Sequence, residues 1–360
     1  MITFNPGPSQ LAPETKDDIH AALDKHLLQI SHRSPLFSEI SEKAIEGVRK
    51  YFNIPADYKI FYTTSATESM KLSLANCCEN KSFHFINGSF SALYAKISES
   101  LHKEAVRDEV EWGTQNDFQN TEVPADCDFI TITHNETSTG VICNDEDVKT
   151  VREKYPEAIL AVDITSSAGG VEIDISNADI WCFSVQKCLG LPAGLGLIFV
   201  SPKAYDRSVE LLEKKKNFAG VFNFPNMWKK METKYQTVCT PNVLKIFLMG
   251  ELMERWNTAG GAKEIERQTL EKEKIFNDFL ETQDTITHFV KDKAHRSHTV
   301  FTLNAPEEFI AKIHETSQDD GMTIGKGYGK LKPTVFRVAN FPAVTKENME
   351  QLVEFLKKSL

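Results

Sequence analysis

Short apolar runs that alternate with longer amphipathic segments constrain the fold of this 360-residue chain more than any other feature. Six runs have the length and composition of β-strands, at residues 59–63, 82–87, 128–133, 159–163, 180–184 and 196–201. Helical patterns lie between several of them, as at 67–78, 89–103 and 145–155. Strands that alternate with helices favour a mostly parallel sheet covered by helices on both faces. The pattern therefore predicts an α/β fold.

The pattern changes near residue 240. Two long helical stretches, 242–257 and 262–282, are separated by Gly260-Gly261, and strand-like runs follow at 298–303 and 334–339. A chain of this length with 41% hydrophobic residues can form one large core and one smaller core. We therefore expect three parts: a short N-terminal segment, 1–15, a large α/β domain, 16–254, and a small α+β domain, 255–360.

Composition and charge exclude several classes of protein. The net charge of −10 argues against nucleic-acid binding, which needs a basic surface. The first residues lack the basic and apolar regions of a secretory signal, and no apolar run approaches the roughly 18 residues of a membrane span. Seven cysteines without a C-x-x-C motif are typical of reduced thiols rather than of disulfides or a zinc site. We expect a soluble, cytoplasmic protein without a bound metal.

The strongest chemical signal lies in residues 184–194, Ser-Val-Gln-Lys-Cys-Leu-Gly-Leu-Pro-Ala-Gly. Lys187 follows one predicted strand, Asp163 ends another, and ligands of open α/β sheets gather at the carboxyl ends of strands. A lysine that forms a Schiff base and an aspartate beside a pyridinium nitrogen are the protein's share of pyridoxal phosphate (PLP) chemistry. Taken singly, Asp163 fits an ordinary turn equally well, but its pairing with Lys187 favours a catalytic role for both. Lys187 would then also move a proton as a general base.

A turn rich in hydroxyl groups offers donors for the phosphate of such a cofactor. Ser65, Ala66 and Thr67 follow a predicted strand and open a predicted helix, where backbone N–H groups bind anions. The turn also fits a capping box, because Glu68 lies three positions after Ser65, and both functions can hold at once. Phe90 begins the next predicted helix, where its ring suits either stacking on a pyridine ring or packing in the core.

Cationic side chains at two places suit an anionic substrate. His32 and Arg33 lie in a polar loop, and an arginine there offers a planar fork for an anion, although a solvated loop explains them as well. Arg337 lies within an apolar strand-like run, where a charge needs a partner. That partner is either a substrate carboxylate or a structural ion pair.

Together, these residues resemble class V aminotransferases over nearly the whole chain. The resemblance rests on Asn135-Glu136-Thr137, Val162-Asp163, residues 184–194, Cys239-Thr240-Pro241 and Arg337. It implies fold type I of PLP enzymes, with a large domain built on a mostly parallel sheet and a smaller C-terminal α+β domain. It also implies a homodimer whose active sites lie at the subunit interface, with segment 1–15 near the active site.

The resemblance assigns a role to each candidate residue. Lys187 would form the Schiff base, Asp163 would contact the pyridine nitrogen, and Arg337 would bind the substrate α-carboxylate. Thr240 would reach the cofactor phosphate from the neighbouring subunit. The cofactor-binding residues that it implies are Ser65, Ala66, Thr67, Phe90, Thr137, Asp163, Ser166, Gln186, Lys187 and Thr240.

Within the class, the chain is most similar to phosphoserine aminotransferases, which interconvert O-phosphoserine and 2-oxoglutarate with 3-phosphohydroxypyruvate and glutamate. Its opening, Phe4 to Ser9, and its loop Ser31-His32-Arg33 match that group, whose loop binds the distal anion of the substrate. The chain departs from the group at Phe90, which is commonly Trp, at Cys239, which is Asn, and at Gly327-Tyr328-Gly329, which is Gly-His-Arg. Lys330 and Lys332 are candidates to replace the missing charge.

Two other functions stay open. Residues 134–141 and 186–192 resemble serine or alanine–glyoxylate aminotransferases at least as well, although that group usually has an acid where this chain has Ser34. The chain could also be a catalytically silent binding protein with this fold, but it retains Lys187, Asp163 and Arg337. The aromatic segment 217–228 is expected either at the dimer interface or in the core.

Overall fold

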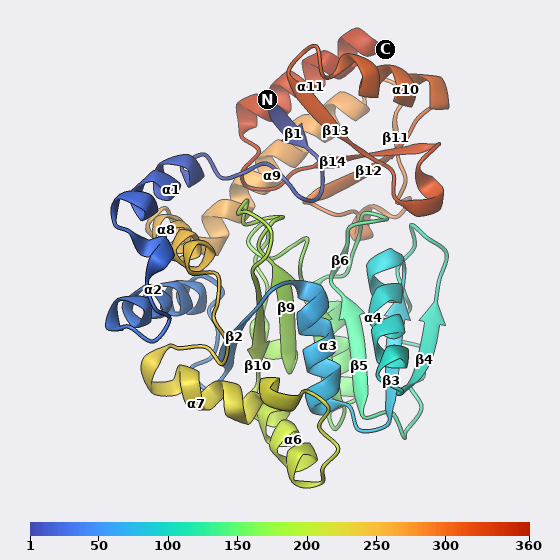
Figure 1. Ribbon diagram of the computed structural model, residues 1–360. Coiled ribbons are helices and arrows are strands. Elements are labelled where there is room, and N and C mark those ends of the chain that lie inside the picture. The colour runs from blue at the N-terminus through green and yellow to red at the C-terminus, as the bar shows by residue number, and fades with distance from the viewer.

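A seven-stranded sheet forms the centre of the computed structural model, which describes residues 1–360 (Figure 1). Its strand order is β2-β10-β9-β8-β5-β3-β4. Only β10 runs antiparallel to its neighbours, so the prediction of a mostly parallel α/β sheet is confirmed. The strands are β2 (Lys59–Thr63), β3 (Lys81–Ile86), β4 (Glu104–Glu109), β5 (Phe129–Thr133), β8 (Ile159–Asp163), β9 (Ile180–Ser184) and β10 (Gly196–Val200).

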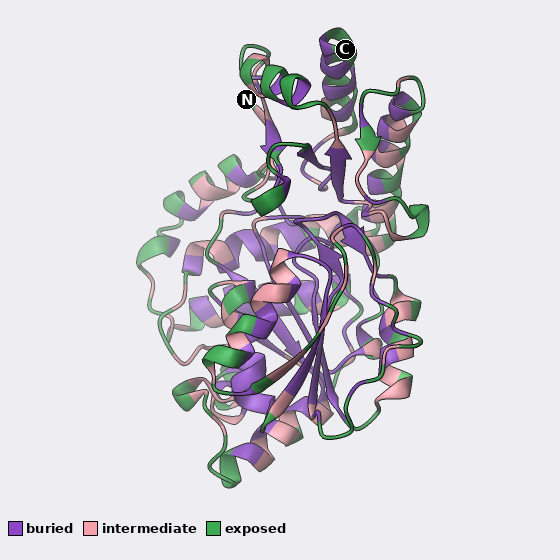
Figure 2. Cartoon of the chain, turned by 90° about the vertical axis from the view of Figure 1, so that its right-hand side faces the viewer, coloured by how far each residue is buried: buried purple, intermediate pink, exposed green.

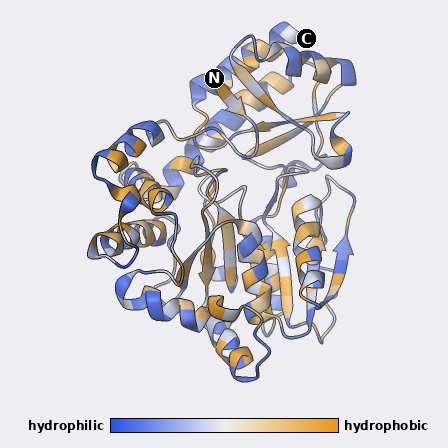
Figure 3. Ribbon diagram, viewed as in Figure 1, coloured by the Kyte–Doolittle hydropathy of each residue, from blue (hydrophilic) through white to orange (hydrophobic).

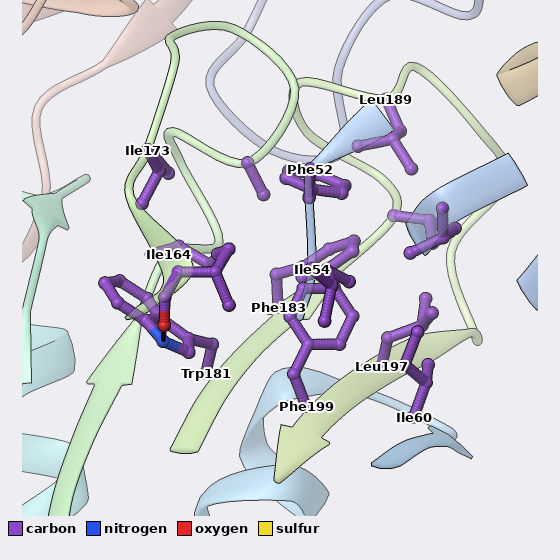
Figure 4. Close-up of a cluster of buried hydrophobic side chains, with 14 of the residues drawn as sticks. Phe52, Ile54, Ile60, Ile164, Ile173, Trp181, Phe183, Leu189, Leu197 and Phe199 are labelled. Carbon is purple, nitrogen blue, oxygen red and sulfur yellow. Dashed lines mark hydrogen bonds between the residues drawn. The ribbon is translucent and has the colours of Figure 1, made fainter. Parts of the chain in front are cut away.

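Helices cover both faces of this sheet, and alternate residues of each strand enter different cores. Leu197 and Phe199 of β10 belong to the larger hydrophobic cluster, which Figure 4 shows in part, whereas Ile198 and Val200 belong to a second cluster. This alternation is expected of strands buried on both faces. The helices of this part are α1 (Thr15–Asp24), α2 (Pro35–Tyr51), α3 (Ala66–Cys77), α4 (Ser89–Ser100), α5 (Asp145–Lys154), α6 (Pro202–Glu213), α7 (Phe224–Lys234) and α8 (Val243–Thr258).

A second, five-stranded sheet with its own hydrophobic cluster forms the upper part of the molecule in Figure 1. Its strand order is β1-β13-β14-β12-β11. The first strand of the chain, β1 (Ile2–Phe4), pairs in parallel with β13 (Met322–Lys326), so both termini lie in this part. The other elements are α9 (Gly261–Leu280), β11 (Thr287–His288), β12 (Val300–Asn304), α10 (Glu307–Thr316), β14 (Val335–Ala339) and α11 (Lys346–Ser359).

Short elements connect these layers. A two-stranded ribbon, β6 (Asn135–Glu136) and β7 (Val141–Ile142), follows β5 at the edge that faces the small sheet. The 3₁₀ turns are η1 (Leu27–Gln29), η2 (Ile175–Asn177), η3 (Gly220–Phe222), η4 (Lys293–His295) and η5 (Gly329–Leu331). None of the helices combines the length and the apolar character that crossing a bilayer requires.

The sequence pattern missed the edge strands β1 and β4, and it also missed β11, β13 and the short β6–β7 ribbon. β4 reads Glu-Ala-Val-Arg-Asp-Glu, and it is drawn in hydrophilic blue at the right of Figure 3. Charged residues on an edge strand protect it from pairing with another chain, and they also remove the apolar signal of a strand. The other six strands of the large sheet are almost wholly buried, as the purple strands of Figure 2 show, and the pattern located all six.

Candidate active site

A polar cavity of about 220 Å³ lies where the carboxyl ends of β8 and β9 face the small domain. Three parts of the chain meet there: the N-terminal segment, the large sheet and the strand region near β14. Its lining residues are Pro6, Gly7, Pro8, Ala66, Thr67, Met70, Phe90, Thr137, Asp163, Thr165, Ser184, Gln186, Lys187, Tyr328 and Arg337. The fold thus brings most of the predicted cofactor-binding residues into one cavity.

Lys187 is buried, and its ammonium group faces two hydroxyls. Nζ donates to Thr137 Oγ1 at 2.6 Å and to Ser166 Oγ at 3.1 Å. Burial lowers the pKa of Lys187 to about 8, against the opposing effect of the nearby Asp163 carboxylate. A lysine with this pKa gives up its proton far more readily than a solvated one, as a general base near neutral pH requires.

Asp163 ends β8 and is also buried. Its Oδ1 accepts a hydrogen bond from the Thr165 backbone N–H at 2.9 Å and another from the Thr165 hydroxyl, while Oδ2 accepts none from the protein. Burial raises the pKa of Asp163 above its ordinary value, and the two bonds from Thr165 oppose that rise. Oδ2 is therefore free to pair with a protonated ring nitrogen.

The predicted phosphate turn opens α3. Ser65 caps this helix, since its side chain accepts from the Glu68 N–H at 3.2 Å. The Ala66 N–H points at Ser184 Oγ, and both residues, with Thr67, line the cavity. Capping and anion binding are compatible here, because the cap orients N–H groups that an anion can also use.

Phe90 and Arg337 approach the cavity from opposite domains. The Phe90 ring centre lies 4.7 Å from Lys187 Nζ. Arg337 Nε donates to the Lys326 carbonyl and Nη1 donates to the Thr137 carbonyl, each at 2.8 Å, so that Nη2 is left for a ligand. Burial lowers the pKa of Arg337 to about 10, which reflects a cation held without a protein carboxylate. This is the arrangement that a substrate carboxylate would complete.

Seven predicted residues do not line this cavity. Two of them lie beside it, Ser65 as the cap of α3 and Ser166 as a hydrogen-bond partner of Lys187 Nζ. Arg33 is exposed and donates to the Thr237 and Val238 carbonyls at 2.7 and 3.3 Å. Thr240 lines a separate groove with the neighbouring residues 236–242. Lys330 lies over the Trp112 ring, with Nζ 4.5 Å from its centre. His32 and Lys332 are likewise absent from the lining of the Lys187 cavity.

Several residues of the site were not assigned a role from the sequence, although some lie within segments that it singled out. Ser184 and Thr165 are ordinary strand-end residues until the fold brings them to the cavity. Pro6 to Pro8 reach it because β1 anchors the chain start in the small domain, and Ser9 Oγ then donates to the Lys187 carbonyl at 2.8 Å. The signals for these positions were the match of Phe4 to Ser9 to phosphoserine aminotransferases, the motif 184–194 and the departure at Tyr328.

Comparison with known proteins decides the family. A sequence model of the family "Aminotransferase class-V" matches residues 2–339. The chain belongs to the class V aminotransferases. It is 29% identical to a phosphoserine aminotransferase of Corynebacterium glutamicum (strain R), over 97% of this chain and 92% of that protein. The expectation of a PLP-dependent transaminase that acts on amino and oxo acids is thus confirmed.

Solved structures of the class agree with this fold. A phosphoserine aminotransferase of Cytophaga hutchinsonii is 36% identical, with a TM-score of 0.95 over 99% of this chain and 98% of that chain. An alanine–glyoxylate aminotransferase of Nostoc sp. shares the fold with a TM-score of 0.83, at 19% identity over 99% and 94% of the two chains. The prediction of fold type I, the fold of these PLP enzymes, is confirmed.

The residues of this class V aminotransferase fit the PLP that its family implies. The cavity offers a buried lysine, a buried carboxylate with one free oxygen, an aromatic ring and the N-terminus of a helix. These groups match an aldehyde carbon, a pyridine nitrogen, the face of a ring and a phosphate, respectively. Each of the polar groups is already oriented by a neighbour, so the site is preorganised.

Proposed function

We propose that this class V aminotransferase is a phosphoserine:2-oxoglutarate aminotransferase that works as a homodimer. PLP, when bound, supplies an electron sink for the carbanion at the substrate α-carbon. The chain supplies the rest: Lys187 would hold the cofactor and carry the α-proton, and Asp163 would keep the ring nitrogen protonated. Thr137 and Ser166 would orient the reacting groups through their hydroxyls.

One observation carries the substrate assignment. The His32-Arg33 loop lies against residues 236–238, next to Thr240, and none of these residues lines the Lys187 cavity of its own subunit. Gln236 Nε2 also donates to the Arg33 carbonyl at 3.3 Å, so loop and segment form one surface unit. We infer that this unit serves the site of a partner subunit, where Thr240 would bind the cofactor phosphate and Arg33 a distal substrate anion. The names of the relatives support phosphoserine as the source of that anion.

The second candidate is a serine or alanine–glyoxylate aminotransferase. It is favoured by Tyr328, which lines the cavity where phosphoserine aminotransferases carry a cationic His-Arg pair. Lys330 does not replace that charge in the single chain, since it faces Trp112. A neutral phenol suits a substrate with an unphosphorylated side chain better than it suits a phosphate dianion.

A half-reaction separates the two candidates. Purified holoenzyme is mixed with O-phospho-L-serine, L-serine or L-alanine in the absence of an oxo acid, and the visible absorbance of the bound cofactor is followed. Conversion by O-phosphoserine at a concentration at least about tenfold below that of the other two supports the proposal. A preference for serine or alanine supports the second candidate and overturns the first.

A further inference from the structure

The Glu136 carboxylate is fully buried, and every hydrogen bond it accepts comes from the start of α4 or from Ser138. Oε2 accepts from the backbone N–H groups of Phe90 and Ser91, both at 2.9 Å, and from the Ser91 hydroxyl at 3.1 Å. Oε1 accepts from the Ser138 N–H at 3.0 Å and from its hydroxyl at 2.6 Å. A buried anion is stable there because five donors and the positive end of a 12-residue helix surround it.

The backbone of Gly88 is shaped around this carboxylate. A Cβ atom at Gly88 would lie 2.4 Å from Glu136 Cγ and 2.6 Å from Ser138 Oγ, so no larger residue fits without displacing them. The Ser89 N–H in turn donates to Ser138 Oγ at 2.9 Å. The start of α4 and the chain after β5 are therefore joined by the Glu136 carboxylate, with the bond between Ser89 and Ser138 beside it.

Two residues beside the Glu136 carboxylate, Phe90 and Thr137, contact Lys187. Phe90, whose N–H the carboxylate holds, places its ring 4.7 Å from Lys187 Nζ. Thr137, the next residue after Glu136, accepts from the same Nζ at 2.6 Å. The charged groups that act on Lys187 besides Glu136 are Asp163 and Arg337, with a weaker contribution from the Cys188 thiol. Glu136 and Asp163 favour the protonated lysine, whereas burial and Arg337 oppose it.

We propose that Glu136 is a positioning residue, whose buried carboxylate fixes Phe90 over the cofactor ring and Thr137 against the group that Lys187 carries. The inference rests on the proposed roles of Lys187 and Phe90. It adds a residue that does not line the cavity and that acts only through its neighbours. The substitution Glu136→Gln tests it well, because the amide keeps the shape but turns an NH₂ group towards N–H donors.

We expect Glu136→Gln to raise the dissociation constant of PLP about tenfold, since a buried donor is left unsatisfied. The pH midpoint at which the visible band of the bound cofactor titrates should fall by about one unit, because loss of an anion disfavours the protonated form. Asp147→Asn is the matched control: Asp147 Oδ2 accepts the Asn144 N–H at 2.9 Å at the start of α5, outside the cavity. It should lower the thermal midpoint slightly and leave both cofactor readouts unchanged.

Two further variants keep the test decisive. Ser138→Ala retains the carboxylate but removes one of its donors, and it should raise the PLP dissociation constant about threefold. In a Phe90→Leu background, Glu136→Gln should have a smaller effect on that constant than in the wild type, because the two residues then share one function. Unchanged PLP affinity and band midpoint in Glu136→Gln, or additive effects of the two substitutions, would overturn the inference. Wild-type protein that takes up no PLP would instead overturn the proposed function.

Discussion

At the scale of single residues, the site contains a buried cation, Arg337, that has no carboxylate partner in the chain. Arg337 has two backbone carbonyl acceptors and no carboxylate, and the ring of Tyr328 lies 5.5 Å from its guanidinium carbon. The same ring lies 5.4 Å from that of Phe90. Tyr328 thus separates the residue that would bind the α-carboxylate from the residue that would stack on the cofactor.

The ring of Tyr328, rather than its hydroxyl, should matter for the carboxylate. Tyr328→Leu removes the aromatic face beside Arg337, and we expect the KM for amino-acid substrates to rise about fivefold to tenfold, the value of a partly desolvated cation–π contact. Tyr328→Phe keeps the face and should stay within about twofold of the wild type. Steady-state kinetics with each amino donor measure the effect. Equal losses in both variants would assign the role to the hydroxyl instead.

Of the two glycines that flank Tyr328, only Gly329 departs from the Gly-His-Arg pattern of phosphoserine aminotransferases. Gly329 has a φ of +52°, which disfavours an arginine at this position. A Cβ at Gly327 would lie 2.5 Å from the Val335 carbonyl oxygen. Gly327 is common to both patterns, so restoring Gly-His-Arg meets its backbone penalty at position 329, where an arginine would adopt a left-handed conformation.

At the scale of elements, the sequence predicted best the strands that are buried on both faces of the sheet. β2, β8 and β9 have the bounds expected from their apolar runs, because strands buried on both faces carry an uninterrupted signal. β4 was missed because charged residues line an edge strand, and β1 because three residues give no period. Lys187 and Asp163 could be paired from sequence alone because both lie at strand ends, whereas Ser184 and Thr165 needed the fold.

Helix α9 carries a buried lysine that makes the stability of the protein depend on pH. Lys272 Nζ donates to the Phe341 and Val344 carbonyls at 2.9 and 2.7 Å, and no carboxylate faces it. Burial lowers its pKa from 10.5 to about 7, against a small opposing effect of the Cys188 thiol. Between these two values the unfolded chain binds a proton that the native state lacks, so stability rises with pH across this window.

The variant Lys272→Met should flatten that dependence. We expect the free energy of unfolding to lose a slope of up to about 1.4 kcal/mol per pH unit between pH 7 and pH 10, the largest slope that one proton gives. Urea unfolding at several pH values measures it. Lys274→Met, on the exposed side of α9, should leave the slope unchanged because Lys274 pairs only with Asp278. An unaltered slope in Lys272→Met would show that Lys272 keeps its proton in the native state.

At the scale of the whole molecule, the single chain separates the predicted site residues into two groups. Lys187, Asp163, Thr137, Phe90 and Arg337 share one cavity, and Arg33 and Thr240 lie on a different surface. Sequence spacing cannot show this division, because the distance of two residues along the chain does not determine whether the fold places them in one cavity. Segment 217–228 divides between its two expected places: Phe218 and Val221 are exposed, at 63% and 61% accessibility, as residues of an unformed interface would be, whereas Phe224 and Met227 pack in the core.

Mixed dimers test the division directly. Lys187→Ala and Arg33→Ala homodimers should each lose most phosphoserine aminotransferase activity, the first for want of the catalytic amine and the second for want of the anion contact. If Arg33 serves the partner's site, a mixed dimer holds one intact site, in which the intact Lys187 and the intact Arg33 come from different subunits. Random exchange of equal amounts should then restore about a quarter of the wild-type sites. If Arg33 serves its own subunit, every site in the mixture lacks one residue and no activity returns.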